Sequence, residues 1–311
     1  MSKALVFPGQ GAQAIGMGQA LAEAYPAAQA VFDEVDDALG EPLSKLIWEG
    51  DIEELTLTQN AQPALMATSI AALRALQAEG VSVQKSAFVA GHSLGEYSAL
   101  AAAGSLSVAD AARLLRTRGR AMQEAVPVGV GAMAAILGLD LAAVREVAAE
   151  AAQGEVCEAA NDNDPAQVVV SGHRAAVERA VDIAKAKGAK RAMLLPVSAP
   201  FHCALMAPAA EVMAEALDAV EIKAPVVPLV ANVIAAPVSD PAEIRRLLVE
   251  QVTGSVRWRE SVVAMAAAGV DEVWEIGSGK ALSGMIRRIE RSISCKAVGT
   301  PDDVRSVIVG G

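Results

Sequence analysis

The sequence predicts an α/β protein built on a mainly parallel sheet, and three observations support this. The chain has 311 residues, enough for about two domains or for one large domain with an insertion. Hydrophobic residues make up 53% and charged residues 20%, which provides a sizeable core and excludes general disorder. Short apolar runs alternate with longer helical patterns, and this alternation is typical of a parallel sheet covered by helices.

The first 125 residues follow this alternation. Ser107 and Asp110 resemble a capping box, which places the start of a further helix near Val108. The other elements expected here are strands at 4–7 and 87–90, helices near 19–38 and 61–79, and a helix from the turn at 91–95 to about residue 103.

Residues 128–197 show a different order of predicted strands and helices from the rest of the chain. The expected elements are a strand at 130–139, a helix at 141–152, strands at 156–160 and 167–171, a helix at 174–187 and a strand at 192–197. We expect residues 161–165, which are rich in Asn and Asp, to form the turn between the middle strands. This β-α-β-β-α-β order is ferredoxin-like. It predicts a small subdomain at 128–197, inserted into a large one formed by 1–127 and 198–311.

The α/β alternation resumes after the insertion. The expected elements are a strand at 226–231, helices at 241–251 and 260–268, a strand at 272–276, a helix at 280–290 and a last strand near 296–298. Internal repeats and long linkers are absent from the sequence.

Charge and cysteine content exclude several classes of protein. The net charge of −11 argues against a general nucleic-acid binder, which needs a broad basic face. The three cysteines, Cys157, Cys203 and Cys295, provide neither a disulfide framework nor metal-ligand spacing. No signal peptide or membrane span is visible, since prolines interrupt the apolar runs. We therefore expect a cytoplasmic protein without a metal.

Residues 91–95, Gly-His-Ser-Leu-Gly, form a G-x-S-x-G motif between a predicted strand and a predicted helix. This context suits a nucleophile, because the flanking glycines allow a sharp turn that projects the Ser93 hydroxyl. The helix N-terminus aims N–H groups at the same point, and the Leu94 N–H would form half of an oxyanion hole. The alternative is an inert serine in a glycine-flanked turn.

A serine nucleophile needs a base, usually a histidine. His92 adjoins Ser93, and neighbouring side chains on an extended chain point to opposite sides. His173 falls in a predicted turn and is expected to be exposed to solvent. His202 follows a strand and a break at Pro200, which indicates a loop, where functional sites often assemble. Elimination favours His202 as the base. The alternative is that His202 has a purely structural role.

Arg118 lies on the apolar side of the helix that starts near Val108. The stripe is formed by Ala111, Leu114, Leu115, Met122 and Ala125. The residues expected on the polar side are Arg113, Arg116, Thr117 and Arg120. A buried arginine needs an anion. Both an internal carboxylate and a substrate carboxylate held by the guanidinium fork remain open.

Two other motifs are less informative. The glycines around Gln10 do not give the dinucleotide-binding G-x-G-x-x-G pattern, although their N–H groups follow a strand and would face the same sheet edge as Ser93. Residues 277–280 lack the spacing of a phosphate-binding loop and predict a strand–helix turn.

Taken together, several stretches resemble those of the malonyl-CoA:acyl carrier protein transacylases. They are FPGQGAQ at 7–13, GHSLGEY at 91–97, RGRAMQ at 118–123, FHCALM at 201–206 and QVTGSVRW at 251–258. They occur in the family's order and span most of the chain. The resemblance implies an α/β-hydrolase-like large subdomain with a ferredoxin-like insertion, which agrees with the pattern described above.

The resemblance also implies a mechanism. Ser93 would attack the malonyl thioester with His202 as its base, the backbone N–H groups of Leu94 and Gln10 would hold the oxyanion, and the backbone carbonyl of Gln251 would orient the histidine. The remaining residues expected to contact the substrate are Arg118, on the malonyl carboxylate, Met122 and Phe201. The malonyl group would pass to the phosphopantetheine thiol of an acyl carrier protein, with ping-pong kinetics and no cofactor of the enzyme's own.

Phe201 departs from many stand-alone bacterial relatives, which carry serine before the histidine. We expect Phe201 to narrow the pocket against an α-methyl branch, a discrimination worth about 1–3 kcal/mol. The acidic carrier would need a local basic patch on this acidic chain. Two groups of residues are candidates, and each is equally well explained as a solvated surface: Lys185, Lys187, Lys190 and Arg191, and Arg287, Arg288 and Arg291.

Two alternative functions stay open. A serine esterase or thioesterase would need an acid that orients His202, and it would have no use for Arg118. A non-catalytic relative would only bind a carrier protein. Our main expectation is a monomeric malonyltransferase that supplies fatty-acid synthesis and acts on malonyl-CoA and acyl carrier protein.

Overall fold

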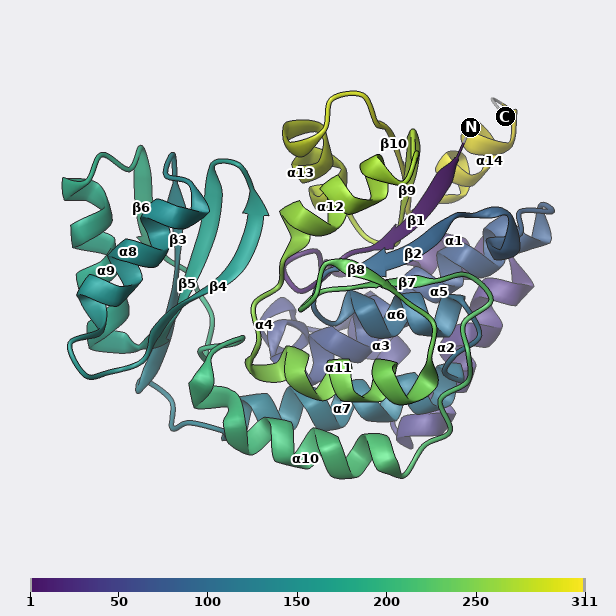
Figure 1. The fold of residues 1–311 in the computed structure, drawn as a ribbon. Coiled ribbons are helices and arrows are strands. Elements are labelled where there is room, and N and C mark those ends of the chain that lie inside the picture. The colour runs from purple at the N-terminus through teal and green to yellow at the C-terminus, as the bar shows by residue number, and fades with distance from the viewer. Residues whose placement is uncertain (1, 310–311) are drawn as a thin grey trace.

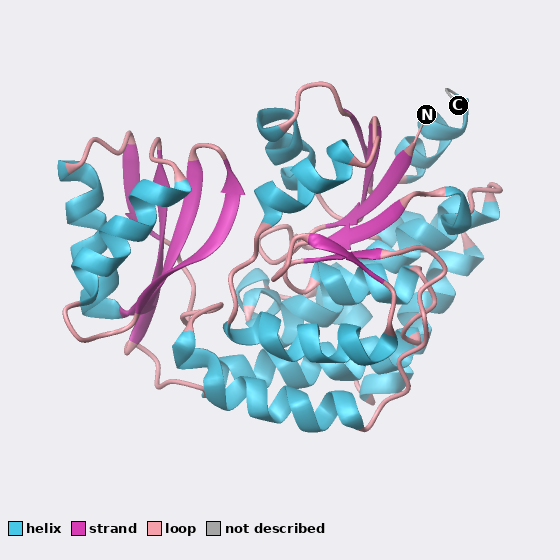
Figure 2. Cartoon of the chain, viewed as in Figure 1, coloured by secondary structure: helices cyan, strands magenta, loops and turns pink. Residues whose placement is uncertain are grey.

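A computed structural model of the chain, which describes residues 2–309, contains two separate sheets with helices packed on them (Figures 1 and 2). The strands of the larger sheet are β1 (Lys3–Phe7), β2 (Phe88–Gly91), β7 (Leu229–Ala231), β8 (Ala236–Val238), β9 (Glu272–Ile276) and β10 (Ser294–Val298). Their order is β10-β9-β1-β2-β7-β8, and every pairing except β7–β8 is parallel. The predicted α/β class is confirmed.

Strand β8 was not expected from the sequence. It pairs antiparallel with β7 at the edge of the sheet and contains Pro237. Proline cannot donate a hydrogen bond to a neighbouring strand and therefore occurs mainly on edge strands. An edge strand of three residues around a proline carries almost no sequence signal.

Helices cover both faces of the large sheet (Figure 1). They are α1 (Gln19–Ala24), α2 (Pro26–Leu39), α3 (Leu43–Glu49), α4 (Ile52–Thr56), α5 (Thr58–Ala78), α6 (Gly95–Ala102), α7 (Val108–Glu124), α10 (Ala207–Asp218), α11 (Pro241–Thr253), α12 (Trp258–Ala267), α13 (Ala281–Ile289) and α14 (Pro301–Val309). The hydroxyl of Ser107 accepts a hydrogen bond from the Asp110 N–H at 3.0 Å, as the predicted cap of α7 requires.

The helix expected at 19–38 is two helices. The chain is extended at Tyr25, and Pro26 then starts α2. Proline suits the first position of a helix, because its missing N–H would have no partner there. The helices that the sequence analysis did not predict are α3, α4, α10 and α14.

The smaller sheet lies beside the larger one and has two helices on one face (Figure 2). Its elements are β3 (Gly131–Leu137), α8 (Leu141–Ala152), β4 (Cys157–Asp164), β5 (Gln167–His173), α9 (Arg174–Ala186) and β6 (Arg191–Leu194). The strand order is β4-β5-β3-β6 and all pairings are antiparallel, which is the ferredoxin-like arrangement. All six elements lie within residues 128–197.

The turn predicted at 161–165 is wrong. Strand β4 continues to Asp164, with irregular pairing to β5, and its polar end lies against the large subdomain. Asp162 pairs with Arg259 at 2.9 Å and Asp164 with Arg288 at 2.7 Å. The Asp162 N–H donates to the Val256 carbonyl at 3.0 Å. Partners more than 90 residues away supply the contacts that water would supply in a turn, and local sequence does not reveal them.

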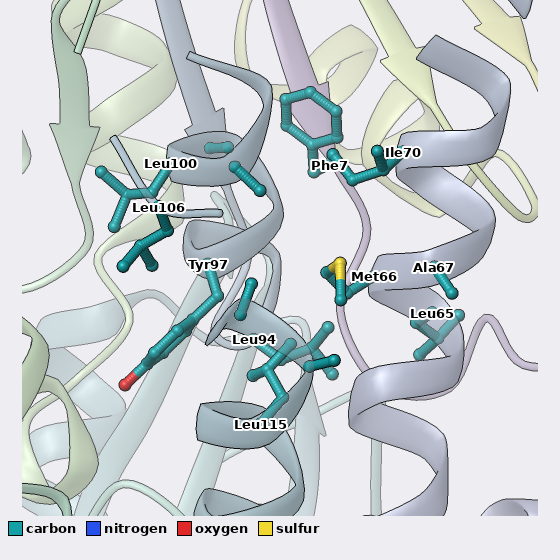
Figure 3. Close-up of a cluster of buried hydrophobic side chains, with 14 of the residues drawn as sticks. Phe7, Leu65, Met66, Ala67, Ile70, Leu94, Tyr97, Leu100, Leu106 and Leu115 are labelled. Atoms are coloured by element: carbon teal, nitrogen blue, oxygen red, sulfur yellow. The ribbon is translucent and has the colours of Figure 1, made fainter. Parts of the chain in front are cut away.

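The main core lies between the large sheet and the helices on one of its faces. Figure 3 shows Phe7 of β1 beside Met66 and Ile70 of α5, and Leu94, the residue before α6, beside Leu115 of α7. Buried apolar side chains thus hold the end of β1, where Phe7 pairs with Gly91 of β2, and the start of α6, so both sides of the Ser93 turn are fixed. None of the helices within residues 2–309 combines the length and the apolar character that a membrane span requires.

Candidate active site

Ser93 occupies a tight turn between β2 and α6. Its φ of 53° lies in the left-handed region, which costs a non-glycine residue of order 1–3 kcal/mol. The glycines on either side are sterically necessary. A Cβ on Gly91 would lie 2.0 Å from the carbonyl of Gly95, and one on Gly95 would lie 2.2 Å from the carbonyl oxygen of Phe7. The motif therefore forms the strained turn expected of a nucleophile.

His202 lies beside Ser93. Its Nε2 is 2.8 Å from the Ser93 Oγ, and its Nδ1 is 2.9 Å from the backbone carbonyl oxygen of Gln251. Because a carbonyl only accepts, Nδ1 carries the proton and Nε2 is free to accept the serine proton. His202 is 4% exposed and also has a left-handed φ, of 58°. The site is a Ser–His pair oriented by a neutral carbonyl.

The His202 imidazole is held in its neutral form. Burial, and then the positive charge of Arg118, lower its pKa from 6.5 to about 3. A neutral imidazole can accept a proton from Ser93 at physiological pH.

The other two histidines lie elsewhere. Nε2 of His92 is 2.8 Å from the Asn163 Oδ1 of the small subdomain, and its ring lies near Trp258. His173 ends strand β5, where its Nδ1 accepts the Val156 N–H at 2.9 Å. The expectation of an exposed turn at His173 is wrong, because the ring is half-buried and completes the pairing of two strand ends.

Arg118 is 1% exposed and reaches the nucleophile from α7. Its Nη1 donates to the Gln62 Oε1 at 2.7 Å. Its Nη2 donates to the Gln251 Oε1 at 2.8 Å and to the Ser93 Oγ at 3.1 Å. Within residues 2–309 it forms no salt bridge, and all three acceptors are neutral. The sequence left an internal carboxylate and a substrate carboxylate open as partners of Arg118. No carboxylate within residues 2–309 pairs with it, so the substrate carboxylate is the alternative that remains.

The prediction that Arg116 lies on the exposed side of α7 is wrong. The helix pattern assigned it to the polar side of α7, but it is buried and donates to Asn60 and Glu41. Helix α7 packs against α2, α5 and α10, so its buried surface is wider than one apolar stripe. The amide of Asn60 on α5 and the carboxylate of Glu41, in the segment between α2 and α3, replace water around the guanidinium.

Gln251 of α11 links the parts of the site. Its side-chain Nε2 donates to the Ser93 carbonyl at 3.0 Å, to the Asn232 Oδ1 at 3.2 Å and to the Glu96 carboxylate. Its Oε1 accepts from Arg118, and its backbone carbonyl accepts from His202. One residue thereby contacts the guanidinium and both members of the Ser–His pair.

Sequence reasoning missed four polar residues around this network: Gln62, Glu96, Asn163 and Asn232. Asn232 supports the turn directly, since its Oδ1 accepts the Ser93 N–H at 2.9 Å and its Nδ2 donates to the Gly91 carbonyl at 2.7 Å. Only Glu96 gave a signal, as a lone carboxylate in the first turn of an otherwise apolar helix. Asn232 comes from a loop 139 residues away, and no local pattern marks it.

The segment after β1 packs against the Ser93 turn. The His92 N–H donates to the Phe7 carbonyl at 3.1 Å, and a Cβ on Gly9 would lie 2.6 Å from the carbonyl oxygen of His92. Gln10 follows directly, and its side-chain Oε1 accepts the Thr58 hydroxyl at 2.8 Å. Leu94 is the N-cap of α6. Their oxyanion-binding role stays a prediction.

The two remaining substrate-contact candidates are buried near these groups. Met122 is one turn beyond Arg118 on α7, and its Sδ accepts from the Gln62 side chain at 3.8 Å. Phe201 immediately precedes His202 and is 8% exposed. Their contacts with substrate stay predictions.

The described residues support neither a metal site nor a cysteine nucleophile. Among residues 2–309, no cluster of three or more His, Cys, Asp or Glu side chains could hold a metal ion. Cys203, next to His202, is buried, and burial raises the pKa of its thiol to about 11. A thiol with that pKa is a poor nucleophile at neutral pH.

The chain is similar in sequence to known proteins. The chain matches the family described as acyl transferase domain over residues 4–278. It is 50% identical to the malonyl CoA-acyl carrier protein transacylase of Bacillus subtilis, over 99% of this chain and 97% of that protein. It is 47% identical to the protein of that name from Escherichia coli K12, over 98% of each.

Solved structures agree with these sequence matches. The acyl-carrier-protein-S-malonyltransferase of Bartonella henselae superimposes with a TM-score of 0.97 and 56% identity, covering 100% of this chain and 99% of that one. A complex of a type II PKS acyl-carrier protein with its malonyl-transacylase gives a TM-score of 0.97 at 43% identity, with 100% of both chains covered.

Proposed function

The chain belongs to the acyl transferase family and, within it, to the malonyl CoA-acyl carrier protein transacylases, and we propose that it carries out the two half-reactions of that family through Ser93. It transfers a malonyl group from malonyl-CoA to the phosphopantetheine thiol of an acyl carrier protein. The observation that carries the assignment is Arg118, a buried guanidinium 3.1 Å from the nucleophile, whose hydrogen-bond partners among residues 2–309 are all neutral.

In the first half-reaction, the Ser93 Oγ attacks the thioester carbonyl while His202 Nε2 takes the hydroxyl proton. The carbonyl oxygen becomes an oxyanion between the N–H groups of Leu94 and Gln10, where each donor contributes about 3 kcal/mol to the transition state. The Gln251 carbonyl stabilises the imidazolium through Nδ1–H. The C–S bond then breaks, and the coenzyme A thiolate takes the proton from His202.

Arg118 selects the acyl group. A malonyl group on Ser93 carries a carboxylate three bonds from Oγ, which lets it reach a guanidinium that already contacts Oγ. Bidentate pairing of guanidinium and carboxylate provides both attraction and orientation. The carboxylate also offsets the positive charge that lowers the His202 pKa, which makes the base stronger when malonyl is bound.

The second half-reaction reverses the first. His202 removes the proton from the phosphopantetheine thiol, the thiolate attacks the malonyl-Ser93 ester, and Ser93 leaves with a proton returned by His202. Coenzyme A is a substrate carrier and phosphopantetheine belongs to the partner protein, and for that reason we assign the enzyme no cofactor. A monomeric state and a cytoplasmic location remain predictions.

The two alternatives are less well supported. An esterase triad would place a carboxylate on His202 Nδ1, where this chain has the carbonyl of Gln251. A binding-only relative would not need a nucleophile hydrogen-bonded to its base.

The test is to incubate the protein with malonyl-CoA alone and to measure its intact mass. We expect one malonyl adduct on the parent protein and none on Ser93→Ala. Release of coenzyme A without an adduct would support a hydrolase instead. The absence of both adduct and release would refute the malonyl donor.

A further inference from the structure

Glu96 is a buried carboxylate that the proposed reaction does not use. It lies in the first turn of α6, three residues after Ser93, and is 2% exposed. No cation within residues 2–309 forms a salt bridge with it. Its Oε1 accepts the backbone N–H of Asn232 at 3.0 Å, and its Oε2 accepts from the Gln251 side chain. Burying a carboxylate without an ion pair is costly, which indicates that its position matters.

Glu96 is the one charged acceptor among the three groups that fix which way the Gln251 side-chain amide points, the other two being the Ser93 carbonyl and the Asn232 Oδ1. An amide has one donating and one accepting end. Glu96 and the Ser93 carbonyl hold the donating Nε2, and this leaves Oε1 facing the Arg118 Nη2 at 2.8 Å. Rotating the amide by half a turn would place NH₂ against the guanidinium, where both groups only donate.

An acceptor-only group is required at position 96. Both of its partners donate, and the Asn232 N–H belongs to the backbone and cannot be exchanged for an acceptor. A glutamine at position 96 would have to aim its own NH₂ either at that N–H or at Gln251. In the second case Gln251 would turn and lose its acceptor contact with Arg118.

We propose that Glu96 is a positioning residue, whose carboxylate fixes the Gln251 amide and thereby holds the Arg118 guanidinium in place for a substrate carboxylate. This inference rests on the proposed function. Above its pKa, which burial raises to about 7, Glu96 also places a negative charge near the buried cation without occupying its binding face, because Gln251 lies between them. A direct salt bridge would compete with the malonyl group for the same nitrogen atoms.

The Gln251 side chain, which contacts Arg118, and the Gln251 backbone carbonyl, which contacts His202, can be perturbed separately. His202 contacts the backbone carbonyl of Gln251, which lies on helix α11 and does not follow a rotation of the side chain. Glu96→Gln therefore weakens recognition of the malonyl carboxylate and leaves affinity for an acyl group without a carboxylate unchanged.

The experiment measures the affinity of malonyl-CoA and of acetyl-CoA by calorimetry at pH 8, above the raised Glu96 pKa of about 7, in the Ser93→Ala background, where no acyl transfer occurs. Glu275→Gln is the matched control. Glu275 is 0% exposed and likewise accepts from two donors, the N–H groups of Leu282 at 3.0 Å and Ser283 at 2.7 Å, but it lies on β9 outside the site.

With Glu96→Gln we expect the preference for malonyl-CoA over acetyl-CoA to fall by about tenfold, which corresponds to about 1.4 kcal/mol. With Glu275→Gln the preference is expected to stay at the parental value. An unchanged preference in Glu96→Gln, or equal losses for both ligands, would overturn the proposal. Absence of any malonyl preference in Ser93→Ala itself would instead refute carboxylate recognition and the proposed function.

Discussion

At the scale of single residues, both members of the Ser–His pair have a strained backbone conformation. Ser93 and His202 both have left-handed φ angles, of 53° and 58°, in a chain where such angles otherwise fall almost entirely on glycines. Strain of this kind persists only where the surroundings fix the conformation. Here the contacts of Ser93 with Asn232 and of His202 with Gln251 do so.

The first prediction concerns His202 and acid stability. Its folded pKa of about 3 lies below the ordinary 6.5, and the unfolded chain therefore binds a proton more readily below pH 6.5. The stabilising effect of the neutral ring is complete above pH 6.5. It falls by about 1.4 kcal/mol for each pH unit below that, until the pH approaches the folded pKa.

Urea unfolding of the parent protein and of His202→Gln at pH 7.5 and 5.5 checks this. The parent should lose about 1.4 kcal/mol more than the variant on acidification. Glu96, whose pKa burial raises to about 7, acts in the opposite direction, but it is present in both proteins and cancels in the difference. Equal losses in the two proteins would show that His202 titrates normally.

The residues with local signals were predictable and those with distant partners were not. The G-x-S-x-G turn identified Ser93, and the interrupted apolar stripe identified Arg118. His202 needed elimination among three histidines. Glu96 and Asn232 meet across 136 residues through a hydrogen bond that leaves no periodicity in the sequence. The packing of α11 and the loop after β7 against α6 brings them together.

At the scale of elements, the close contact of α7 with α5 sets the position of Arg118. Gly119, its neighbour on α7, lies directly against α5, because a Cβ there would be 2.5 Å from the Gln59 Cα. Residues 59–62 of α5 carry Gln62, which binds the guanidinium. The spacing of the two helices therefore enters the geometry of the site.

The second prediction compares two helical glycines. Gly284→Ala on α13 has space, its nearest neighbour being the flexible end of Arg288 at 3.7 Å, and alanine should raise the free energy of unfolding by up to about 1 kcal/mol. Gly119→Ala gains the same propensity but must push α5 away, and should lower that free energy by about 1–3 kcal/mol. Urea unfolding of both variants checks the opposite signs. Stabilisation by Gly119→Ala would show that the two helices can separate without cost.

The elements that the sequence failed to predict share a physical cause. Helix α10 has few fully buried apolar side chains, and α4 has five residues, so neither produces a strong periodic signal. The polar end of β4 has the composition of a turn but is buried by ion pairs with the large subdomain. In each case tertiary contacts, and not local propensity, decide the structure.

At the scale of the whole molecule, polar contacts join the two subdomains. The end of β4 contributes the ion pairs of Asp162 and Asp164, and Asn163 between them meets His92 beside the nucleophile. Directional bonds of this kind fix orientation more sharply than apolar packing does. The loop that carries Phe201 and His202 follows β6 of the small subdomain, and its course into the site depends on this joint.

The distribution of charge over the surface bears on carrier binding. The chain has a net charge of −11, and docking of an acidic carrier requires a local basic area. In the first candidate group, Lys187 pairs with Glu150 at 2.6 Å, whereas Lys185, Lys190 and Arg191 are exposed and form no salt bridge within residues 2–309. In the other candidate group, Arg288 is paired with Asp164, and Arg287 donates to the Cys295 carbonyl. Each group thus has one ion-paired member, and the first group is the better docking candidate because it keeps three exposed cations without a salt bridge within residues 2–309.

The third prediction tests this with two charge reversals of equal size. Lys190→Glu with Arg191→Glu should raise the KM for the carrier protein several-fold at low ionic strength, and added salt should reduce the difference, since exposed charges are screened. Arg287→Glu with Arg291→Glu changes the net charge equally and should have a smaller effect. Formation of the malonyl adduct from malonyl-CoA should be unchanged in both. Equal effects of the two reversals would attribute carrier binding to net charge alone and would contradict a docking patch on the small subdomain.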